Sequence, residues 1–451
     1  MRLKLISPSR YAGDGRLLRS ERLLLPSLTL PLLAALVPRD IEVSIHNELF
    51  EAIDLDGPAD LVGITATTLN VQRAYELADA FRARGVPVVM GGLHVTLAAD
   101  EAAAHADTLV LGEADETWPA FLTDFRRGAP ARVYRPERPP SLDNLPVPRF
   151  SLLDKYRDRY VGGNRRGLVS RLMKPIVPVQ TARGCPNRCT FCAVTRFSGA
   201  TWRARPAVDV VSEIQALDAR FVAFVDDNIF ANPERAKDLF ARLVPLEIRW
   251  AGQGTVAGAD DPELVRLARQ SGCVGLFVGL ESICEESLAA AGKRTNRVDR
   301  YARNLRAYRR AGIAVDASMV FGFDGEPSTI FADTYRFLVR HRVPFAAWQP
   351  LRPYPGTPLY DRLREQGRLL DERWWLNPAL NRGLFDLVFR TDGRDREHFT
   401  SELLRHYRRL YSPGSVIRRA LLPPGRRAVS TLLLNLAWRR KLTDSTSLTE
   451  Y

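Results

Sequence analysis

Residues 185–192 have the sequence Cys-Pro-Asn-Arg-Cys-Thr-Phe-Cys, which gathers three of the five cysteines of a 451-residue chain into one short stretch. An apolar run at 176–181 precedes it and predicts a strand, and Gly184 and Pro186 favour a tight loop after that strand. Further strand and helix patterns follow along the chain. A ligand loop after the first strand of such an alternation is typical of a (β/α) barrel, whose active sites lie at the carboxyl ends of the strands.

Cys185, Cys189 and Cys192 offer three thiolates, whereas a [4Fe-4S] cluster normally binds four. One iron of such a cluster would keep an open position at which a small molecule can bind. A structural zinc site needs a fourth Cys or His nearby, and the next cysteine is Cys273, in a different predicted strand. Three thiols cannot all pair as disulfides, and the low cysteine count indicates a reducing compartment. The spacing therefore predicts a catalytic iron–sulfur cluster, with Cys273 and Cys284 as free, non-catalytic cysteines.

The region 171–365 is expected to form an incomplete (β/α)6 barrel of the TIM type. Six apolar runs, each followed by a turn and usually by a helical pattern, predict its strands at 176–181, 221–225, 248–251, 275–280, 315–321 and 345–351. Beyond the barrel the pattern weakens, and residues 366–451 are expected to be mainly helical.

Residues 1–128 are expected to form a separate, doubly wound α/β domain of the Rossmann type. The helical spacing is clearest over 71–84, and apolar runs that end in polar residues or glycine predict parallel strands at 41–45, 61–65, 86–90 and 108–111. Residues 129–170 are rich in Pro and Arg, which predicts a semi-extended linker to the barrel.

The composition is that of a folded globular protein, with 45% hydrophobic and 26% charged residues. The net charge of +13 comes from arginines that occur throughout the chain, so charge alone gives no reason to expect a nucleic-acid partner. No apolar run reaches about 18 residues, and the first residues turn polar before a signal-peptide core develops. We therefore expect a cytoplasmic protein.

The Cys-x3-Cys-x2-Cys spacing, with the aromatic Phe191 before the last cysteine, resembles the radical S-adenosylmethionine (SAM) superfamily. The resemblance implies that SAM chelates the open iron through its amino and carboxylate groups. One electron from the cluster would then cleave SAM to methionine and a 5′-deoxyadenosyl radical, while the protein positions the radical and excludes water. It also implies an external electron donor such as flavodoxin or ferredoxin.

Polar residues and glycines follow three of the predicted barrel strands, and the resemblance implies that they contact SAM together with Phe191. From the residues alone, the two aspartates after the second strand can equally organise the turn before a helix predicted at 234–243. The glycine after the fifth strand can serve turn geometry alone. The expected SAM contacts are Phe191, Asp226, Asp227, Glu281, Ser282 and Gly322.

Three predicted strand ends of the first domain, 59–65, 88–94 and 109–113, resemble the cobalamin-binding domain that precedes the barrel in one large radical SAM subfamily. The histidine signature Asp-x-His-x-x-Gly of the classical cobalamin fold is absent, since residues 44–49 are Ser-Ile-His-Asn-Glu-Leu. Two interpretations of this domain therefore remain: it binds cobalamin without a histidine ligand, or it is a scaffold that covers the active site. The resemblance implies cobalamin contacts at Thr65, Gly91, Gly92, His94, Gly112 and Glu113.

These features predict a radical SAM enzyme that acts on an unactivated C–H bond of a small molecule or lipid, with C-methylation as the chemistry that cobalamin would add. Cobalamin-independent cyclisation, oxidation or rearrangement are the alternatives. An RNA-modifying methylthiotransferase would carry cysteines before Cys185 and a carboxyl-terminal β-barrel, and this sequence predicts neither. A non-catalytic iron–sulfur protein would not need the open iron position.

The segment 426–441 has basic residues on both sides of apolar residues at helical spacing. Such a basic amphipathic helix can lie on an anionic membrane surface, which would favour a lipid or other hydrophobic substrate. A helix that packs on the barrel and exposes its arginines explains the same pattern, and the sequence leaves both open.

Overall fold

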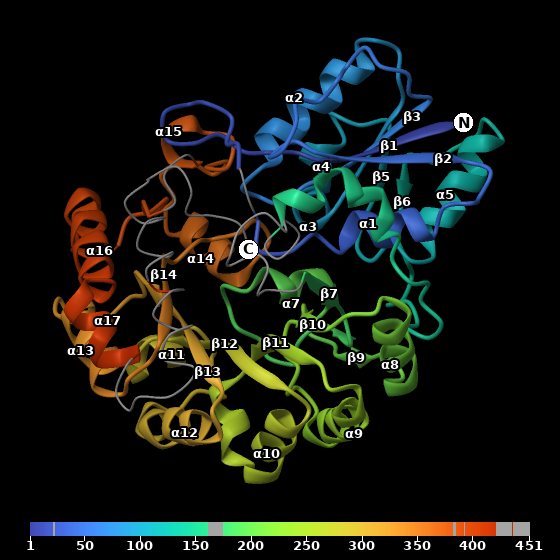
Figure 1. The fold of residues 1–451 in the computed structure, drawn as a ribbon. Helices are drawn as coiled ribbons and strands as arrows, with labels where there is room; N and C mark the ends of the chain where they lie inside the picture. The colour runs from blue at the N-terminus through green and yellow to red at the C-terminus, as the bar shows by residue number, and fades with distance from the viewer. Residues whose placement is uncertain (21–22, 161–174, 382–384, 392, 421–434, 436–451) are drawn as a thin grey trace.

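The computed structural model describes residues 1–20, 23–160, 175–381, 385–391, 393–420 and 435. Figure 1 shows an amino-terminal sheet at the upper right, above an open barrel whose outside is covered by helices. Each of these two sheets contains six parallel strands. The expected α/β class is therefore confirmed, with a doubly wound domain, a partial (β/α)6 barrel and a helical carboxyl-terminal region.

The amino-terminal sheet has the strand order β2-β1-β3-β4-β5-β6. The strand β2 is added on one side of β1, and β3 and the later strands are added on the other side, so the order along the sheet switches between β1 and β3. Open α/β sheets bind ligands outside the carboxyl ends of the strands at such a switch point. The strands are β1 (Arg2–Ser7), β2 (Glu42–Asn47), β3 (Leu61–Thr65), β4 (Val88–Gly91), β5 (Thr108–Val110) and β6 (Val133–Tyr134).

Two of these strands were not predicted from the sequence. In β1 the charged Lys4 interrupts the apolar pattern, yet it is buried because its ammonium donates to the carbonyls of Asp54 at 2.9 Å and Gly57 at 3.1 Å. The two-residue strand β6 is too short to show a period. It lies within the predicted linker, so the chain beyond 128 still contributes to the first sheet.

Helices cover both faces of the amino-terminal sheet. One face packs on α1 (Thr29–Ala35), α5 (Thr117–Arg126) and the 3-10 helix η1 (Phe150–Arg159). The other face packs on α2 (Val71–Arg82), α3 (Leu93–Leu97) and α4 (Ala99–Ala102), and its buried residues belong to the same apolar cluster as those of the barrel. The domain is thus docked on the barrel through a continuous core.

The barrel sheet has the order β14-β13-β12-β11-β10-β7, and within the described ranges its edge strands β7 and β14 do not pair with each other. All six strands lie where the sequence predicted them, within a few residues. They are β7 (Ile176–Val179), β10 (Phe221–Phe224), β11 (Arg249–Gly254), β12 (Cys273–Glu281), β13 (Ala314–Phe321) and β14 (Phe345–Pro350).

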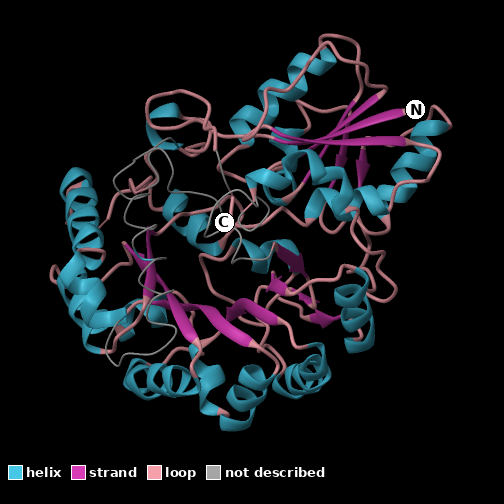
Figure 2. Cartoon of the chain, viewed as in Figure 1, coloured by secondary structure: helices cyan, strands magenta, loops and turns pink. Residues whose placement is uncertain are grey.

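Helices follow the barrel strands and cover the outside of the sheet (Figure 2). Short helices η2 (Val244–Leu246) and η3 (Val256–Asp260) lie between the longer ones. The longer ones are α8 (Ala207–Ala216), α9 (Pro233–Leu243), α10 (Pro262–Gln270), α11 (Glu285–Ala290), α12 (Val298–Ala311), α13 (Ile330–Arg340) and α14 (Pro358–Glu365).

The carboxyl-terminal region continues with α15 (Pro378–Asn381), α16 (Arg396–Leu410) and α17 (Pro413–Ala420). Its two tryptophans are buried: the Trp374 indole donates to the Pro353 carbonyl at 3.0 Å, and the Trp375 indole donates to Glu101 of the amino-terminal domain at 3.0 Å. This region therefore bridges the barrel and the first domain. The predicted membrane segment 426–441 lies outside the described residues, apart from Asn435.

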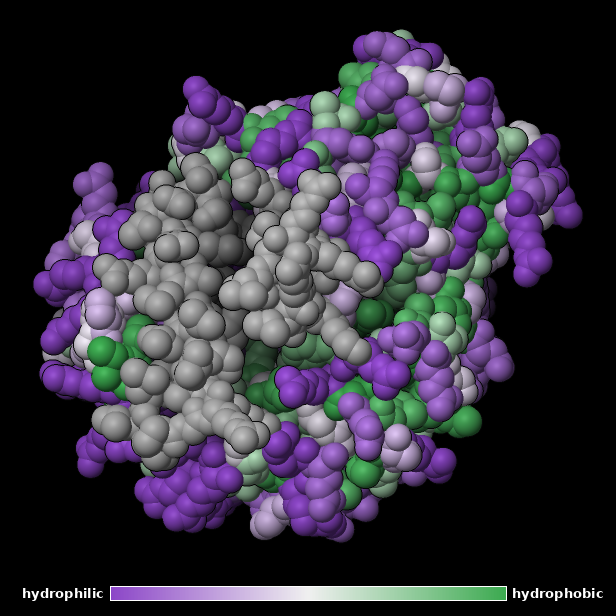
Figure 3. Space-filling model, in the orientation of Figure 1, coloured by the Kyte–Doolittle hydropathy of each residue, from purple (hydrophilic) through white to green (hydrophobic). Residues whose placement is uncertain are grey.

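On the face shown in Figure 3, hydrophilic residues cover most of the outer rim, and hydrophobic residues show in several separate patches between them. Among the residues with a described position, no helix combines the length and apolar character that a membrane span requires.

Candidate active site

The cysteine loop connects β7 to α7 (Ala193–Ser198), and Cys192 directly precedes this helix. The Cys192 backbone N–H donates to the Cys189 carbonyl at 3.2 Å and closes a tight turn. Cys189 is buried, Cys185 and Cys192 are half-buried, and all three are free thiols. Burial raises the pKa of the Cys189 thiol to about 11, so iron has to supply the free energy that converts it to a thiolate.

The donor set of this loop fits a four-iron cluster better than a single ion. Within the described part of the chain, no three His, Cys, Asp or Glu side chains converge closely enough to hold one metal ion. A four-iron cube holds its thiolates further apart than a single ion does. Three soft thiol donors on one loop, with no fourth cysteine in that loop, therefore match a cluster with an open iron.

The two aspartates after β10 bond to the residues that lead into the cysteine loop. Asp226 is buried, and it accepts from the Thr181 N–H at 2.6 Å, the Thr181 hydroxyl at 2.5 Å and the Ala182 N–H at 3.1 Å. Asp227 accepts from the Gly184 N–H at 2.9 Å. These bonds join the aspartates to the segment before the cysteine loop, so they do not support the alternative in which the aspartates organise the turn before α9. Their carboxylates anchor the cysteine loop.

Gly184 is required by the path of this loop. It has a φ of +82°, and a Cβ atom there would collide with the Thr201 carbonyl oxygen. The close approach arises because β8 (Ala182–Arg183) pairs antiparallel with β9 (Arg203–Ala204) and so encloses the cysteine loop between two short strands.

Glu281, at the end of β12, forms a buried ion pair that the sequence did not predict. Its Oε1 lies 2.9 Å from the Lys293 Nζ, and Glu281 itself adopts a φ of +63° after a register shift in the strand. Burial alone would lower the pKa of Lys293, but Glu281, Cys189 and Cys192 raise it and keep this lysine charged. A cation therefore lies beside the cysteines, where it can attract the carboxylate of a bound amino-acid group.

The turn after Glu281 is fixed by side chains from the following segment. The Asn296 amide donates to the carbonyls of Gly279 and Leu280, both at 2.8 Å, and the Tyr301 hydroxyl donates to Leu280 at 2.8 Å. The buried Ser282 hydroxyl accepts from the Cys284 N–H at 3.2 Å. Ser282 therefore already has a local partner, and its hydroxyl shapes the turn.

Phe191 and Gly322 are linked through Phe323, which contacts the Phe191 ring and follows Gly322 in the chain. The Phe191 ring meets Phe323, just after β13, edge-on at a centroid distance of 5.9 Å. Gly322 has a φ of +107°, its N–H donates to Glu326 at 3.0 Å, and a Cβ atom there would meet Leu387 at 3.1 Å. The space beside Gly322 is thus filled by the protein itself.

The predicted cobalamin residues lie at three adjacent strand ends of the amino-terminal sheet. Thr65 ends β3 and pairs in register with Gly91, which ends β4, while Gly112 follows β5. A Cβ atom on Gly92, whose φ is +101°, would meet the Ala66 carbonyl at 2.8 Å. These glycines carry no side chain at the carboxyl edge of the sheet, where open α/β sheets bind ligands, and so let a ligand approach the backbone closely.

His94 does not lie free at this edge. It is fully buried, with its Nδ1 3.1 Å from the Thr68 hydroxyl and its Nε2 3.3 Å from Glu101. The ring also packs edge-on against Trp375 at 5.3 Å. Both nitrogens already have partners, so the structure gives His94 a packing role between the first domain and the carboxyl-terminal region.

Glu113 connects the two predicted cofactor sites. Its Oε2 lies 2.8 Å from the Arg183 guanidinium, and its Oε1 pairs with Arg203. Asp115 pairs with the same Arg183, which precedes Cys185 by two residues. The carboxyl edge of the first sheet therefore faces the cysteine loop. The contact of α3 with α7 supports the same arrangement.

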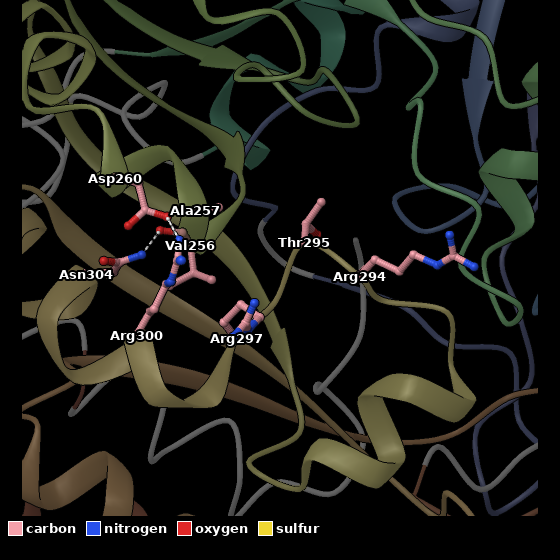
Figure 4. Close-up of a pocket in the computed structure, with 8 residues that line it drawn as sticks. All are labelled: Val256, Ala257, Asp260, Arg294, Thr295, Arg297, Arg300 and Asn304. Carbon is pink, nitrogen blue, oxygen red and sulfur yellow. Dashed lines mark hydrogen bonds and ion pairs between the residues drawn. The ribbon is translucent and has the colours of Figure 1, made fainter.

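A separate pocket of about 210 Å³ lies at η3 and the start of α12, lined by Asp260, Arg297, Arg300 and Asn304 among others. In Figure 4 the Asp260 and Arg300 side chains pair, whereas Arg294 points away from this group. The pocket does not include the cysteines, and the charged residues of its lining are three arginines and one aspartate, which already pairs with Arg300. We assign no ligand to it.

Sequence reasoning missed Arg183, Lys293, Asn296 and Asp115. Arg183 carries a signal, because it immediately precedes the Gly184-Cys185 step of the motif. The other three are separated from the motif by whole strands and helices, so only their position in space marks them.

Comparison with known proteins agrees with this geometry. The family model of the radical SAM superfamily matches residues 179–338, and that of the B12 binding domain matches residues 26–122. Bacteriochlorophyllide d C-8(2)-methyltransferase of Chlorobaculum tepidum is 29% identical over 428 residues, which is 92% of this chain and 91% of the relative. The bacteriochlorophyllide d C-12(1)-methyltransferase of the same organism is 29% identical over 69% of this chain and 67% of its own.

The solved structure of the radical SAM methyltransferase TsrM from Kitasatospora setae, with cobalamin and [4Fe-4S] cluster bound, has the same fold. It superposes with a TM-score of 0.67 at 18% identity, and the alignment covers 98% of this chain and 99% of TsrM. The two matched family models together span more than half of the sequence and coincide with the two sheets. The chain belongs to the radical SAM superfamily and carries a B12-binding domain in front of its barrel.

Proposed function

We propose that this chain is a radical SAM methyltransferase that uses a [4Fe-4S] cluster, SAM and cobalamin to methylate an unactivated carbon of a small molecule or lipid. The observation that carries this proposal is that the ligand edge of the B12-binding sheet faces the cysteine loop, with Arg183 in contact with both. When bound, the cluster supplies the electron that cleaves SAM, and cobalamin carries the methyl group. The methyltransferase relatives favour this chemistry over cyclisation, oxidation or rearrangement.

The chain's own residues have defined tasks in this proposal. Cys185, Cys189 and Cys192 would hold the cluster and leave one iron open for SAM. Lys293, held by Glu281, would face the carboxylate of SAM, and the buried position of this pair keeps water from competing for the charge. The glycines at the strand ends of the first sheet would admit the corrin face of cobalamin.

The test uses the full chain, purified and reconstituted anaerobically with iron and sulfide. With dithionite and SAM it is expected to release 5′-deoxyadenosine, and Cys189→Ala is expected to abolish the release. Cys284→Ala is the matched control, because Cys284 is half-buried like Cys185 and Cys192 but lies outside the loop. Release that persists in Cys189→Ala contradicts the cluster assignment.

The second cofactor is tested separately on the same preparation. Cobalamin added to the chain is expected to survive desalting with a base-off spectrum, because the strand-end loops of the first domain would hold the nucleotide tail away from the cobalt. A chain that retains no cobalamin refutes the methyltransferase proposal and leaves the first domain as a scaffold.

The substrate class to examine first is a tetrapyrrole, because both methyltransferase relatives are named for bacteriochlorophyllide d. The reductant in the cell is proposed to be a flavodoxin or ferredoxin. Either one, reduced, is expected to replace dithionite in the release of 5′-deoxyadenosine.

Contact with an anionic membrane through 426–441 stays a prediction from the sequence. It is tested by flotation of the full chain and of a chain truncated before Arg426 with vesicles that contain phosphatidylglycerol. Equal flotation of the two removes the membrane contact.

A further inference from the structure

Two pairs of like charges meet where the B12-binding domain touches the barrel. Glu113 and Asp115 lie two residues apart in the loop after β5, and both are buried, with side chains 7% and 8% exposed. Arg183 and Arg203 face each other directly across the β8–β9 pair, with side chains 11% and 22% exposed. Within each pair the two side chains repel each other, because like charges in neighbouring positions are unfavourable.

The repulsion within each pair is relieved only when the two domains are docked. Arg183 then lies between both carboxylates, at 2.8 Å from Glu113 and in two contacts with Asp115, while Arg203 pairs with Glu113. Charges that are complementary across an interface and repulsive on each side fix the register of the two surfaces. Removing one member leaves another buried charge without compensation, which is strongly unfavourable.

Both sides of this contact belong to a proposed cofactor site. The carboxylates continue from Gly112 at the ligand edge of the first sheet. The arginines lie on β8 and β9, which enclose the cysteine loop, and Arg183 is two residues from Cys185. A movement of the loop after β5 is therefore passed to the cysteine loop through side chains in direct contact.

We infer that Glu113, Asp115, Arg183 and Arg203 form a domain clamp that couples ligand occupancy of the B12-binding edge to the position of the cysteine loop. The four are positioning residues, which act through the loop and not on the substrate. This inference rests on the proposed function, because it requires that both cofactors bind. Its consequence is that cobalamin and SAM bind with positive coupling, and that each raises the affinity for the other by the same factor.

The test measures the SAM dissociation constant of the reconstituted chain with and without cobalamin. In the parent, cobalamin is expected to lower this constant by about fivefold or more, the usual lower range for coupled sites. Asp115→Asn keeps the size of the side chain and Arg183→Lys keeps its charge, but both remove the bidentate contact between guanidinium and carboxylate. In each variant cobalamin is expected to change the SAM dissociation constant by less than about twofold. Glu213→Gln is the matched control, because it breaks an equally buried pair with Arg205, at 2.6 Å, that lies wholly within the barrel.

Hydrogen exchange gives a second measurement that needs no cobalamin. Asp115→Asn is expected to speed amide exchange in the loop after β5 and across residues 181–192, whereas Glu213→Gln leaves both at parental rates. Retention of cobalamin without any coupling in the parent, or coupling that survives Asp115→Asn, overturns the clamp and leaves the proposed function intact. Loss of cobalamin retention in the parent overturns both.

Discussion

Asp226 gives the sharpest test of how the cysteine loop is held. The superfamily resemblance implied that its charge binds SAM, whereas in the structure its carboxylate accepts three bonds from Thr181 and Ala182. Asp226→Ala removes all three. Asp226→Asn can keep all three, because its amide oxygen still accepts from both N–H groups and its amide nitrogen donates to the Thr181 hydroxyl, which rotates to accept.

The structure sets the expected magnitudes. In Asp226→Ala two buried N–H groups lose their partner, and each such loss costs about 1–3 kcal/mol, so the loop is destabilised by about 2–6 kcal/mol. In Asp226→Asn the neutral bonds are weaker, but no charge has to be buried, and the net change is expected to stay within about 1 kcal/mol. Cluster binding should therefore fail in the first variant and persist in the second.

The assay is the iron and sulfide content per chain after reconstitution, followed by the SAM dissociation constant of each variant that holds a cluster. Asp226→Asn is expected to match the parent in both. If Asp226→Asn holds a full cluster but binds SAM at least tenfold more weakly, the charge itself serves SAM and the positioning argument is refuted.

The same residue makes a pH-dependent contribution to the stability of the apoprotein. Burial raises the pKa of Asp226 from its ordinary value of 3.8 to about 6. A group whose pKa is raised by folding favours the folded state fully below its unfolded pKa, and this contribution is lost as the pH rises through the folded pKa. The difference in unfolding midpoint between parent and Asp226→Asn is thus expected to shift in favour of the variant from pH 4 to pH 6. A difference that does not change over this range contradicts the assignment.

Three further substitutions test the surrounding structure. Gly184→Ala is expected to abolish cluster binding, because its methyl group would meet the Thr201 carbonyl; normal iron content would contradict this. Lys293→Met leaves the buried Glu281 carboxylate without its ion-pair partner and is expected to destabilise the chain by about 3–5 kcal/mol, measured by thermal unfolding. It is also expected to weaken SAM binding, measured by equilibrium dialysis. An unchanged melting temperature would refute this prediction. His94→Gln is expected to lower the melting temperature but to leave cobalamin retention unchanged; selective loss of retention would place this side chain in the ligand site.

The strands of the barrel could be predicted from the sequence because each contains a short apolar run that is closed by a turn, which is a local pattern. The cysteine motif could be recognised for the same reason, since its three cysteines lie within eight residues of sequence. The strand β1 was missed for the opposite reason. Its central Lys4 is satisfied by carbonyls that lie 50 and 53 positions away in the chain, which no window of local sequence contains.

By itself, then, the sequence determined the barrel strands, four of the six strands of the first sheet, the cysteine motif and the family resemblance. The partners of the charged residues were decided only by the tertiary structure. Asp226 bonds to the segment that leads into the cysteine loop, Glu113 pairs with the arginines that flank the loop, and Glu281 pairs with Lys293. The physical reason is that a buried charge takes whichever complementary group folding brings within about 3 Å, and that choice depends on the packing of distant segments.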